Sequence, residues 1–269
     1  HTLTAPNGGV THSTDQSKIG NSSLFINNPT ASTGKYLKTP VSSDFQWSRE
    51  FTVEAWVYPL ASQTGTGQDH FEIIGTEGYY SGSANNWIFR IKPDGHLESR
   101  MYTNQSANFD QDSSSTTASF DARNHVAMTR NSSNRIDFWL NGVSIHNFTW
   151  SGTFNSGNDE LALGKGYGTD TSGHGYWEEL RITEGICRYD HTETFTPHTT
   201  AHPTSTGNTS DDSLYDRVSL LIQSDTTDGS TTFLDGSENV HTITRSGDVH
   251  HDVNQKKFGN TSLYFDGSG

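Results

Sequence analysis

Acidic side chains are the first candidates for chemistry, because two carboxyl groups on one strand face can hydrolyse a glycosidic bond as acid and nucleophile. Since side chains alternate along a strand, such a pair would follow the spacing Glu-x-Asp-x-Glu. The chain does not contain this spacing. Glu178 and Glu179 are adjacent, so on a regular strand they face opposite sides, and Glu54 stands alone in its segment. The acidic pattern therefore predicts no catalytic site.

Histidine is the next candidate, because its imidazole serves both as a base and as a metal ligand. His198 and His202 have the i, i+4 spacing that brings two rings together on a helix. They stand beside Pro197 and Pro203, which argue against a helix, so we expect no metal site there. His125, in "NHVAMTR", is interpreted as a structural imidazole. No serine or cysteine has a histidine at a spacing that suggests a nucleophile.

One aromatic cluster has the chemistry of a sugar-binding surface. A sugar ring stacks on an exposed aromatic face, and amides or carboxylates around it bind the hydroxyls. The stretch "GYYSGSANNW" combines these residue types within a few positions and follows an acidic loop. The predicted glycan-binding residues are Asp69, Tyr79, Tyr80, Asn85, Asn86 and Trp87. The alternative is that Trp87 and one of the two tyrosines pack inward.

Charge and composition exclude several classes of function. The net charge is -14 at pH 7, which disfavours binding to nucleic acid or to an anionic membrane. Cys187 is the single thiol, so no disulfide can form within the chain. No apolar stretch approaches the roughly 20 residues of a membrane helix, and we expect no membrane insertion. The 14 Phe, 10 Tyr and 6 Trp are too many for a disordered chain.

Short alternating segments separated by turn residues must position these side chains. "FTVEAWVYP" places Phe51, Val53, Ala55 and Val57 on one face. Pro93-Asp94-Gly95 and Asn141-Gly142 are typical hairpin turns. No segment has helical periodicity with caps. The sequence therefore predicts an all-β fold.

A repeated phrase indicates that the chain is a section of a tandem array of similar domains. "QSKIGNSSLF" near the start matches "QKKFGNTSLY" near the end, and Gln16 aligns with Gln255, an offset of 239 residues (255 minus 16). This offset is the length of a domain with its linker, far longer than a solenoid repeat. "VSLLIQ", which precedes the second phrase, has no counterpart before the first.

The repeat sets the predicted domain boundaries. Residues 1–193 form a domain that lacks its first strand, and 194–213 form a Thr- and Pro-rich linker. Residues 214–269 begin a second copy and are too short to bury a core alone. They either pack on the first domain and supply what it lacks, or belong to a truncated neighbour. The sequence leaves both arrangements open.

Five phrases in order resemble a known family. "GNSSLF", "FTVEAWVYP", "HVAMTRNSSNRIDFWLNGV", "LALGKG" and "GYWEELRIT" are similar to the concanavalin A-like, laminin G-type jelly roll over roughly residues 1–190. The resemblance implies a two-sheet antiparallel jelly-roll sandwich. The joint between the copies resembles joints in tandem phage virion or tail proteins and in large bacterial surface proteins. That second resemblance implies an extracellular, cell-surface or virion-surface location.

The family resemblance also implies a cofactor. Some relatives hold a structural calcium ion with an acidic residue at the position of Glu178, and Asp170 in the preceding Gly-rich loop is a second candidate ligand. The expected metal is therefore calcium, at Glu178 and Asp170. Glu replaces the more common Asp at this position.

The expected function is that of a non-catalytic repeat module for display or adhesion, with glycan recognition. The expected partners are a cell-surface or extracellular glycan and neighbouring copies of the same repeat. Two alternatives remain open: a polysaccharide-cleaving glucanase of the same fold, and a purely structural fibre repeat without a ligand. Fold alone does not choose among these functions.

Overall fold

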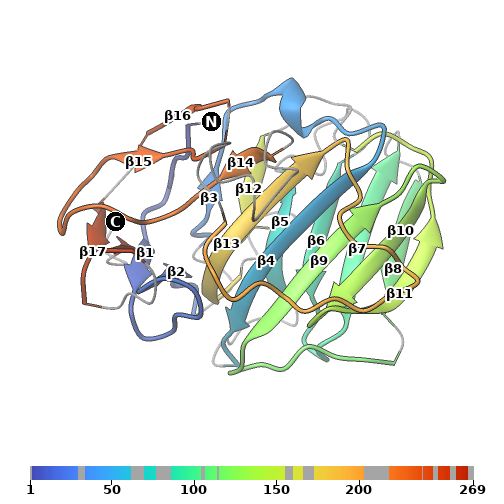
Figure 1. Ribbon diagram of the computed structural model, residues 1–269, viewed down its shortest axis with the longest axis horizontal. Helices are drawn as coiled ribbons and strands as arrows, with labels where there is room; N and C mark the ends of the chain where they lie inside the picture. Colours follow the sequence, from blue (N-terminus) through green and yellow to red (C-terminus); the bar gives the residue numbers. More distant parts are fainter. Residues whose placement is uncertain are drawn as a thin grey trace.

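Two antiparallel sheets lie face to face in the computed structural model (Figure 1). The structure describes residues 2–29, 34–61, 70–76, 86–103, 107–113, 115–154, 160–165, 173–202, 218–237, 239–244, 248–254 and 259–265. Within these ranges there is no α-helix, and one short 3-10 turn, η2 (Ser43–Phe45). The predicted all-β, two-sheet antiparallel sandwich is confirmed.

The larger sheet has eight strands in the order β1-β2-β13-β4-β9-β10-β11, with β14 also paired to β13. These strands are β1 (Val10–Ser13), β2 (Ser23–Ile26), β4 (Phe51–Pro59), β9 (Asn124–Arg130), β10 (Arg135–Leu140), β11 (Val143–Thr149), β13 (Gly175–Glu184) and β14 (Val218–Leu221).

The smaller sheet has six strands in the order β3-β12-β5-β6-β7-β8. These strands are β3 (Leu37–Lys38), β5 (Phe71–Thr76), β6 (Trp87–Ile91), β7 (Leu97–Thr103), β8 (Ala107–Asp112) and β12 (Leu161–Leu163). Two short pairs lie outside both sheets: β15 (Phe233–Leu234) with β16 (Thr242–Ile243), and β17 (Val249–Asp252) with β18 (Ser262–Phe265).

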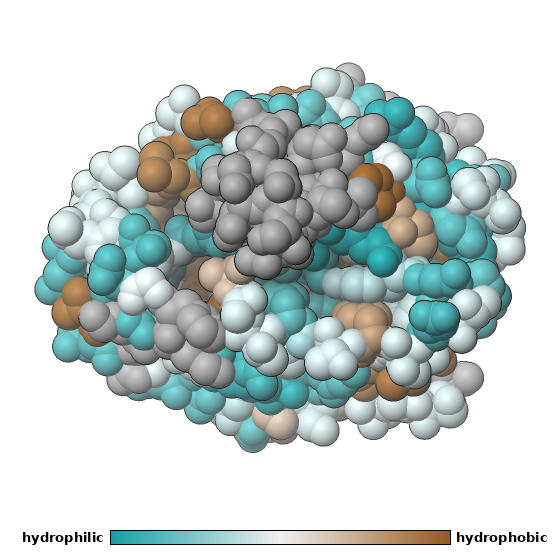
Figure 2. Space-filling model, in the orientation of Figure 1, coloured by the Kyte–Doolittle hydropathy of each residue, from teal (hydrophilic) through white to brown (hydrophobic). Residues whose placement is uncertain are grey.

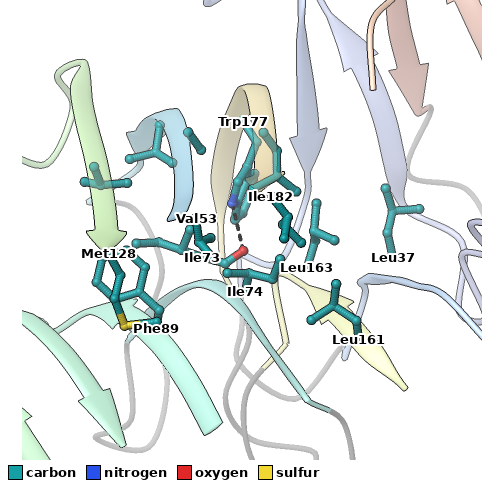
Figure 3. Close-up of a cluster of buried hydrophobic side chains, with 14 of the residues drawn as sticks. Leu37, Val53, Ile73, Ile74, Phe89, Met128, Leu161, Leu163, Trp177 and Ile182 are labelled. Carbon is teal, nitrogen blue, oxygen red and sulfur yellow. Dashed lines mark hydrogen bonds between the residues drawn. The ribbon is translucent and has the colours of Figure 1, made fainter. Parts of the chain in front are cut away.

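The core fills the space between the two sheets. The predicted inward face of β4 is confirmed, since Phe51, Val53, Ala55 and Val57 are all buried in this core. Figure 3 shows side chains of both sheets meeting around Trp177. The Trp177 indole N–H donates to the carbonyl oxygen of Ile73 at 3.2 Å, which ties β13 of one sheet to β5 of the other.

Both predicted turns connect adjacent antiparallel strands. Residues 93–95 join β6 to β7, and Asn141-Gly142 joins β10 to β11. Asn141 and Gly142 have φ values of 50° and 85°, the left-handed conformations that a two-residue hairpin requires. A Cβ at Gly142 would also collide with the carbonyl oxygen of Phe195, so this glycine is needed for a second reason.

A segment without regular structure covers the outer face of the larger sheet. This covering segment, residues 185–202, crosses in front of β4, β9 and β10 (Figure 1). Phe195 stacks on Tyr189 at 3.6 Å between ring centroids. The backbone N–H of Phe195 donates to the carbonyl oxygen of Gly142 at 2.9 Å. The first part of the predicted linker, 194–202, is therefore packed on the sheet, and 203–217 lie outside the described residues.

The C-terminal part of the chain packs on the first domain. β14 pairs with β13, and β18 lies against β1 and β2. Phe233, Val249 and Leu263 join the same buried core as the strands of the sandwich. Of the two arrangements that the sequence left open for residues 214–269, the described part adopts the packed one. Figure 1 shows β15 and β17 grouped beside β1 and β2 at one end of the sandwich.

The repeated phrase folds into the same hairpin twice. In the first copy Val10 pairs with Ile26, and in the second Val249 pairs with Phe265 in the same register. The two hairpins touch: the rings of His12 and His251 stack at 5.8 Å. The equivalent strands of two copies thus form one interface.

The visible surface is mainly hydrophilic, in agreement with the net charge of -14 on the chain. Figure 2 shows a face that is mainly hydrophilic outside its grey area, with apolar residues in separate small groups. Among the described residues, no helix is long and apolar enough to cross a membrane.

The contribution of β14 to stability can be measured by unfolding. Leu220 is fully buried opposite Ile182, whereas Leu234 is 67% exposed. We expect Leu220→Ala to lower the free energy of unfolding by about 3 kcal/mol, because it leaves a cavity in the core. Leu234→Ala should change it by less than ~0.5 kcal/mol. Urea unfolding of both variants makes the comparison, and equal small effects would show that β14 lies outside the cooperative unit.

Candidate functional site

The outer edge of β13 is shared by two strands that are far apart in the sequence. β2 pairs with residues Gly175–Trp177, and β14 pairs with residues Arg181–Thr183. Between these two ladders, no strand of the described part of the chain pairs with residues 178–180 on this side. The sheet edge therefore contains a gap, bounded by the start of β2 and the end of β14.

A β-bulge lies opposite this gap. Glu178 pairs with Trp56 and Arg181 pairs with Glu54, so β13 has one residue more than β4 across this stretch. The extra residue is Glu179, whose φ of 49° is unusual for a residue other than glycine. The bulge interrupts the alternation of side chains, and Glu178 and Glu179 line the same pocket. The expectation that they face opposite sides is thus wrong, because it assumed a regular strand.

The pocket occupies the gap and has a volume of about 310 Å³. Its walls come from the first hairpin, from β13 and from the second copy. The polar lining residues are His12, Ser22, Glu178, Glu179, His202, Gln223, Ser224, Asp225 and Thr261, and the apolar ones include Leu24, Trp177, Leu180, Ile222 and Leu263. The two copies of the repeated phrase thus face one another across it.

Glu178 is held by the loop that precedes β2. The backbone N–H of Lys18 donates to both of its oxygens at 2.6 Å, and the N–H of Ile19 donates to Oε2 at 3.1 Å. Arg123 Nη1 lies 3.6 Å from Oε2. Burial raises the pKa of Glu178 to about 8, because desolvation of the carboxylate outweighs the effects of Arg123 and the two N–H donors.

Glu179 is held by the covering segment and by the chain after β14. Its Oε2 accepts the N–H of His202 at 2.6 Å, and Gln223 hydrogen-bonds to its side chain. Gln223 also donates to the carbonyl oxygen of His202. Burial raises the pKa of Glu179 to about 7, because the desolvation of the carboxylate outweighs the hydrogen bonds from His202 and Gln223, which lower the pKa. The two neighbouring glutamates therefore fasten two different segments around the pocket.

The surroundings of Glu178 do not fit a calcium ion. Calcium requires six to eight oxygen ligands, whereas among the described residues the groups that contact the Glu178 carboxylate are two N–H donors and a guanidinium. Asp170, the second predicted ligand, lies outside the described residues.

The predicted glycan-binding cluster is only partly described. Trp87 is fully buried and packs between Trp47, at 5.2 Å, and Phe154, at 5.5 Å. Its indole offers no face to a sugar, so the prediction for Trp87 is corrected: the hydrophobic core takes this ring. Asn86 is 4% exposed. Asp69, Tyr79, Tyr80 and Asn85 lie outside the described residues, and their role stays a prediction.

A buried polar network lies under the covering segment. Arg181 donates from Nε and Nη2 to Oε1 of Glu54, at 2.8 and 2.6 Å, and the Tyr189 hydroxyl donates to Oε2. Burial alone would raise the pKa of Glu54, but the charge of Arg181 and the hydrogen bond with His125 outweigh it and lower the pKa. His125 Nε2 lies 3.4 Å from Oε2. His125 is fully buried, as expected of a structural imidazole.

Most of the pocket has no signature in the sequence. Glu179, His202 and Gln223 come from three segments, and no short motif contains them. The one available signal was the repeated phrase, because Gly20 and Gly259, at equivalent positions of the two copies, both line the cavity.

Comparisons with known proteins agree with this architecture. The family model described as "Concanavalin A-like lectin/glucanases superfamily" matches residues 31–186. Domain 4 of the extracellular arabinanase AbnA from Geobacillus stearothermophilus, solved with arabinotriose, is 19% identical. Its match covers 69% of this chain and 82% of that chain with a TM-score of 0.50.

A weaker structural match is the carbohydrate-binding module CBM40 of the Ruminococcus gnavus IT-sialidase. It is 11% identical, with a TM-score of 0.44 and coverage of 67% of this chain and 95% of that chain. No curated protein sequence matches the chain. At these identities the likeness to solved structures concerns the fold alone.

The raised pKa of Glu178 predicts how stability depends on pH. A carboxyl group that binds its proton more tightly when folded stabilises the fold below its unfolded pKa near 4.5, and this stabilisation is lost as the pH rises through about 8. We therefore expect the free energy of unfolding to fall, by an amount on the order of 4 kcal/mol from Glu178 alone, between pH 4.5 and 8. In urea titrations Glu178→Gln should remove this part of the slope and leave the part that Glu179 contributes, since burial raises the pKa of Glu179 to about 7.

Glu184→Gln is the matched control for this prediction. Glu184 ends the same strand, and its side chain is 26% exposed. This variant should keep the slope of the unmodified chain. A Glu178→Gln variant with an unchanged slope would contradict the electrostatic interpretation.

Proposed function

Because the chain belongs to the concanavalin A-like lectin/glucanase superfamily, we propose that it is a non-catalytic, extracellular module that binds a short glycan in the pocket beside β13. One observation carries the proposal: a pocket of about 310 Å³ combines carboxyl, amide, imidazole and hydroxyl groups with apolar side chains. This mixture suits a sugar, whose hydroxyls need hydrogen bonds while its C–H faces need apolar contact.

The size of the pocket supports a short ligand. Small-molecule pockets range from roughly 300 to 1,000 Å³, so this pocket is at the lower end. It accommodates one or two sugar rings rather than a long chain. The arabinanase domain of the same fold is described with arabinotriose, which makes short oligosaccharides a sensible first set of ligands.

Polysaccharide hydrolysis is the second candidate, and one observation favours it. The carboxyl groups of Glu178 and Glu179 face one pocket, and burial raises the pKa of both. Each group, however, accepts a backbone N–H from a neighbouring segment. To act as acid or nucleophile it would have to leave that partner, which opens the wall of the pocket. We therefore assign both glutamates a structural role.

The repeat supports a wider context for the module. We propose that the chain is part of a long surface or virion protein whose tandem copies serve for display or adhesion. The contact between the hairpin of one copy and that of the next, with His12 stacked on His251, is the kind of joint that such an array requires. β14 supports this view, because a strand from the second copy pairs with a sheet edge of the first.

A glycan array tests the binding proposal, followed by calorimetry with any glycan retained. Ser22 lines the pocket and is half-buried, so Ser22→Phe would fill the space for a sugar ring. We expect this variant to weaken binding by at least ~10-fold, which corresponds to about 1.4 kcal/mol. Near-UV circular dichroism checks that the variant remains folded.

Ser48→Phe is the matched control, since Ser48 is exposed and does not line the pocket. It should bind like the unmodified chain. If no glycan is retained, the binding proposal fails and the structural repeat remains. If Ser22→Phe binds normally while Tyr79→Ala or Tyr80→Ala does not, the glycan site is the predicted aromatic cluster instead.

Reducing-sugar release from soluble polysaccharides separates binding from hydrolysis. We expect no release above the rate without protein, because both carboxyl groups are engaged by the backbone. Release that disappears in Glu178→Gln or Glu179→Gln would overturn the non-catalytic assignment. Release that persists in both variants would indicate a contaminating enzyme.

A further inference from the structure

Side chains from the covering segment and the outer face of the larger sheet converge at one buried point. Glu54 on β4 and His198 and His202 on the covering segment offer ligand atoms that all lie within 4.8 Å of one another. The rings of His198 and His202 are 4.1 Å apart between centroids. No helix is needed for this proximity, because the extended segment folds back over Glu54.

We propose that Glu54, His198 and His202 form a site for a divalent transition-metal ion such as Zn²⁺, with His125 as a fourth candidate ligand. The ion would fasten the covering segment to β4 and β9. This site is separate from the glycan pocket in its ligands, although the backbone N–H of His202 donates to Glu179 in the pocket wall. It also replaces the expectation that the i, i+4 histidines bind no metal.

Unpartnered ring nitrogens point to a missing ligand. His202 is 5% exposed, and its Nε2 has no hydrogen-bond partner within the described part of the chain. The Nε2 of His198 is likewise buried without a partner there. A buried polar atom without a hydrogen bond costs roughly 1–3 kcal/mol. Two such ring nitrogens lie beside the Glu54 carboxylate, and this arrangement calls for a compensating interaction. A bound metal ion supplies it.

His125 completes a typical donor set. Its Nε2 lies 3.4 Å from Glu54 Oε2, and its ring is 5.5 Å from that of His198. His125 belongs to β9, which pairs directly with β4. Three imidazoles and one carboxylate are the ligands that proteins use for zinc, and imidazole nitrogen disfavours calcium and magnesium.

The required movement is small. Zinc–ligand bonds of about 2.0–2.1 Å place tetrahedral ligand atoms roughly 3.3 Å apart, so ligand atoms separated by up to 4.8 Å must approach by about 1.5 Å. His198 and His202 lie in irregular chain, where side-chain rotation and a slight shift of the backbone suffice. His198 is half-buried, which leaves an entry path from the surface.

The neighbouring Arg181 is compatible with a cation. Its Nε and Nη2 both donate to Oε1 of Glu54, so its charge is already paired with this carboxylate. Oε2 accepts the Tyr189 hydroxyl, and a carboxylate oxygen has a second lone pair that can coordinate a metal. Arg181 thus orients the carboxylate with Oε2 toward the histidines.

The experiment is a titration of the full chain, prepared without a histidine tag and stripped with a chelator. Isothermal calorimetry with Zn²⁺ should show one ion per chain, and Ca²⁺ titrated in parallel should not compete. Co²⁺ in place of Zn²⁺ should give the intense visible absorption of tetrahedral nitrogen and oxygen ligation. Zn²⁺ should also raise the melting temperature, because it binds the folded state.

Paired variants decide whether these residues hold the ion. His198→Gln combined with His202→Gln should weaken Zn²⁺ binding by at least ~100-fold and abolish the shift in melting temperature. His191→Gln is the matched control, because His191 is an exposed histidine of the same segment. It should bind like the unmodified chain.

Three outcomes would overturn the proposal. Unchanged Zn²⁺ binding in the double variant would show an adventitious ion only, held by surface histidines. Absence of binding to the unmodified chain would exclude the site, as would a pale octahedral Co²⁺ spectrum. If the double variant fails to fold, the single variant His198→Gln and the Co²⁺ spectrum of the unmodified chain decide.

Discussion

The hydrogen bonds along the outer edge of β13 are the constraint on which the rest of the structure depends. A strand of 10 residues must pair its backbone groups on both sides, and no single neighbour does so here. β2 supplies one half of the edge and β14, about two hundred residues later, supplies the other. The bulge at Glu179 lies between them, and the pocket opens where the pairing stops.

This division of the edge explains why the two ends of the chain meet. The residues after β14 fold back beside β1 and β2, where the second hairpin packs on the first. The contact of the two equivalent hairpins thus accompanies the completion of the sheet edge by β14. In an array, the same geometry would let each copy close the sheet of the one before it.

The outer face of the larger sheet follows a second constraint. Glu54, Arg181 and His125 point away from the core and yet are almost fully buried, because residues 185–202 cover them. Buried charges require close partners, and Arg181 and Tyr189 provide them for Glu54. The stacked rings of Tyr189 and Phe195 pack on Trp139 of β10, which holds the covering segment on the sheet. Two histidines of this covering segment, His198 and His202, lie beside Glu54 of the sheet beneath it.

The sequence by itself determined the strands, the hairpins and the repeat. Alternation along Phe51–Val57 and the turn at Asn141-Gly142 are local properties, set by the period of the strand and the left-handed backbone of the turn. Tertiary structure alone decided the rest. The bulge at Glu179 depends on its pairing with β4, Trp87 enters the core because Trp47 and Phe154 surround it, and His198 and His202 meet Glu54 because a covering segment folds over a distant strand. Such contacts join residues far apart in the chain, and no local pattern specifies them.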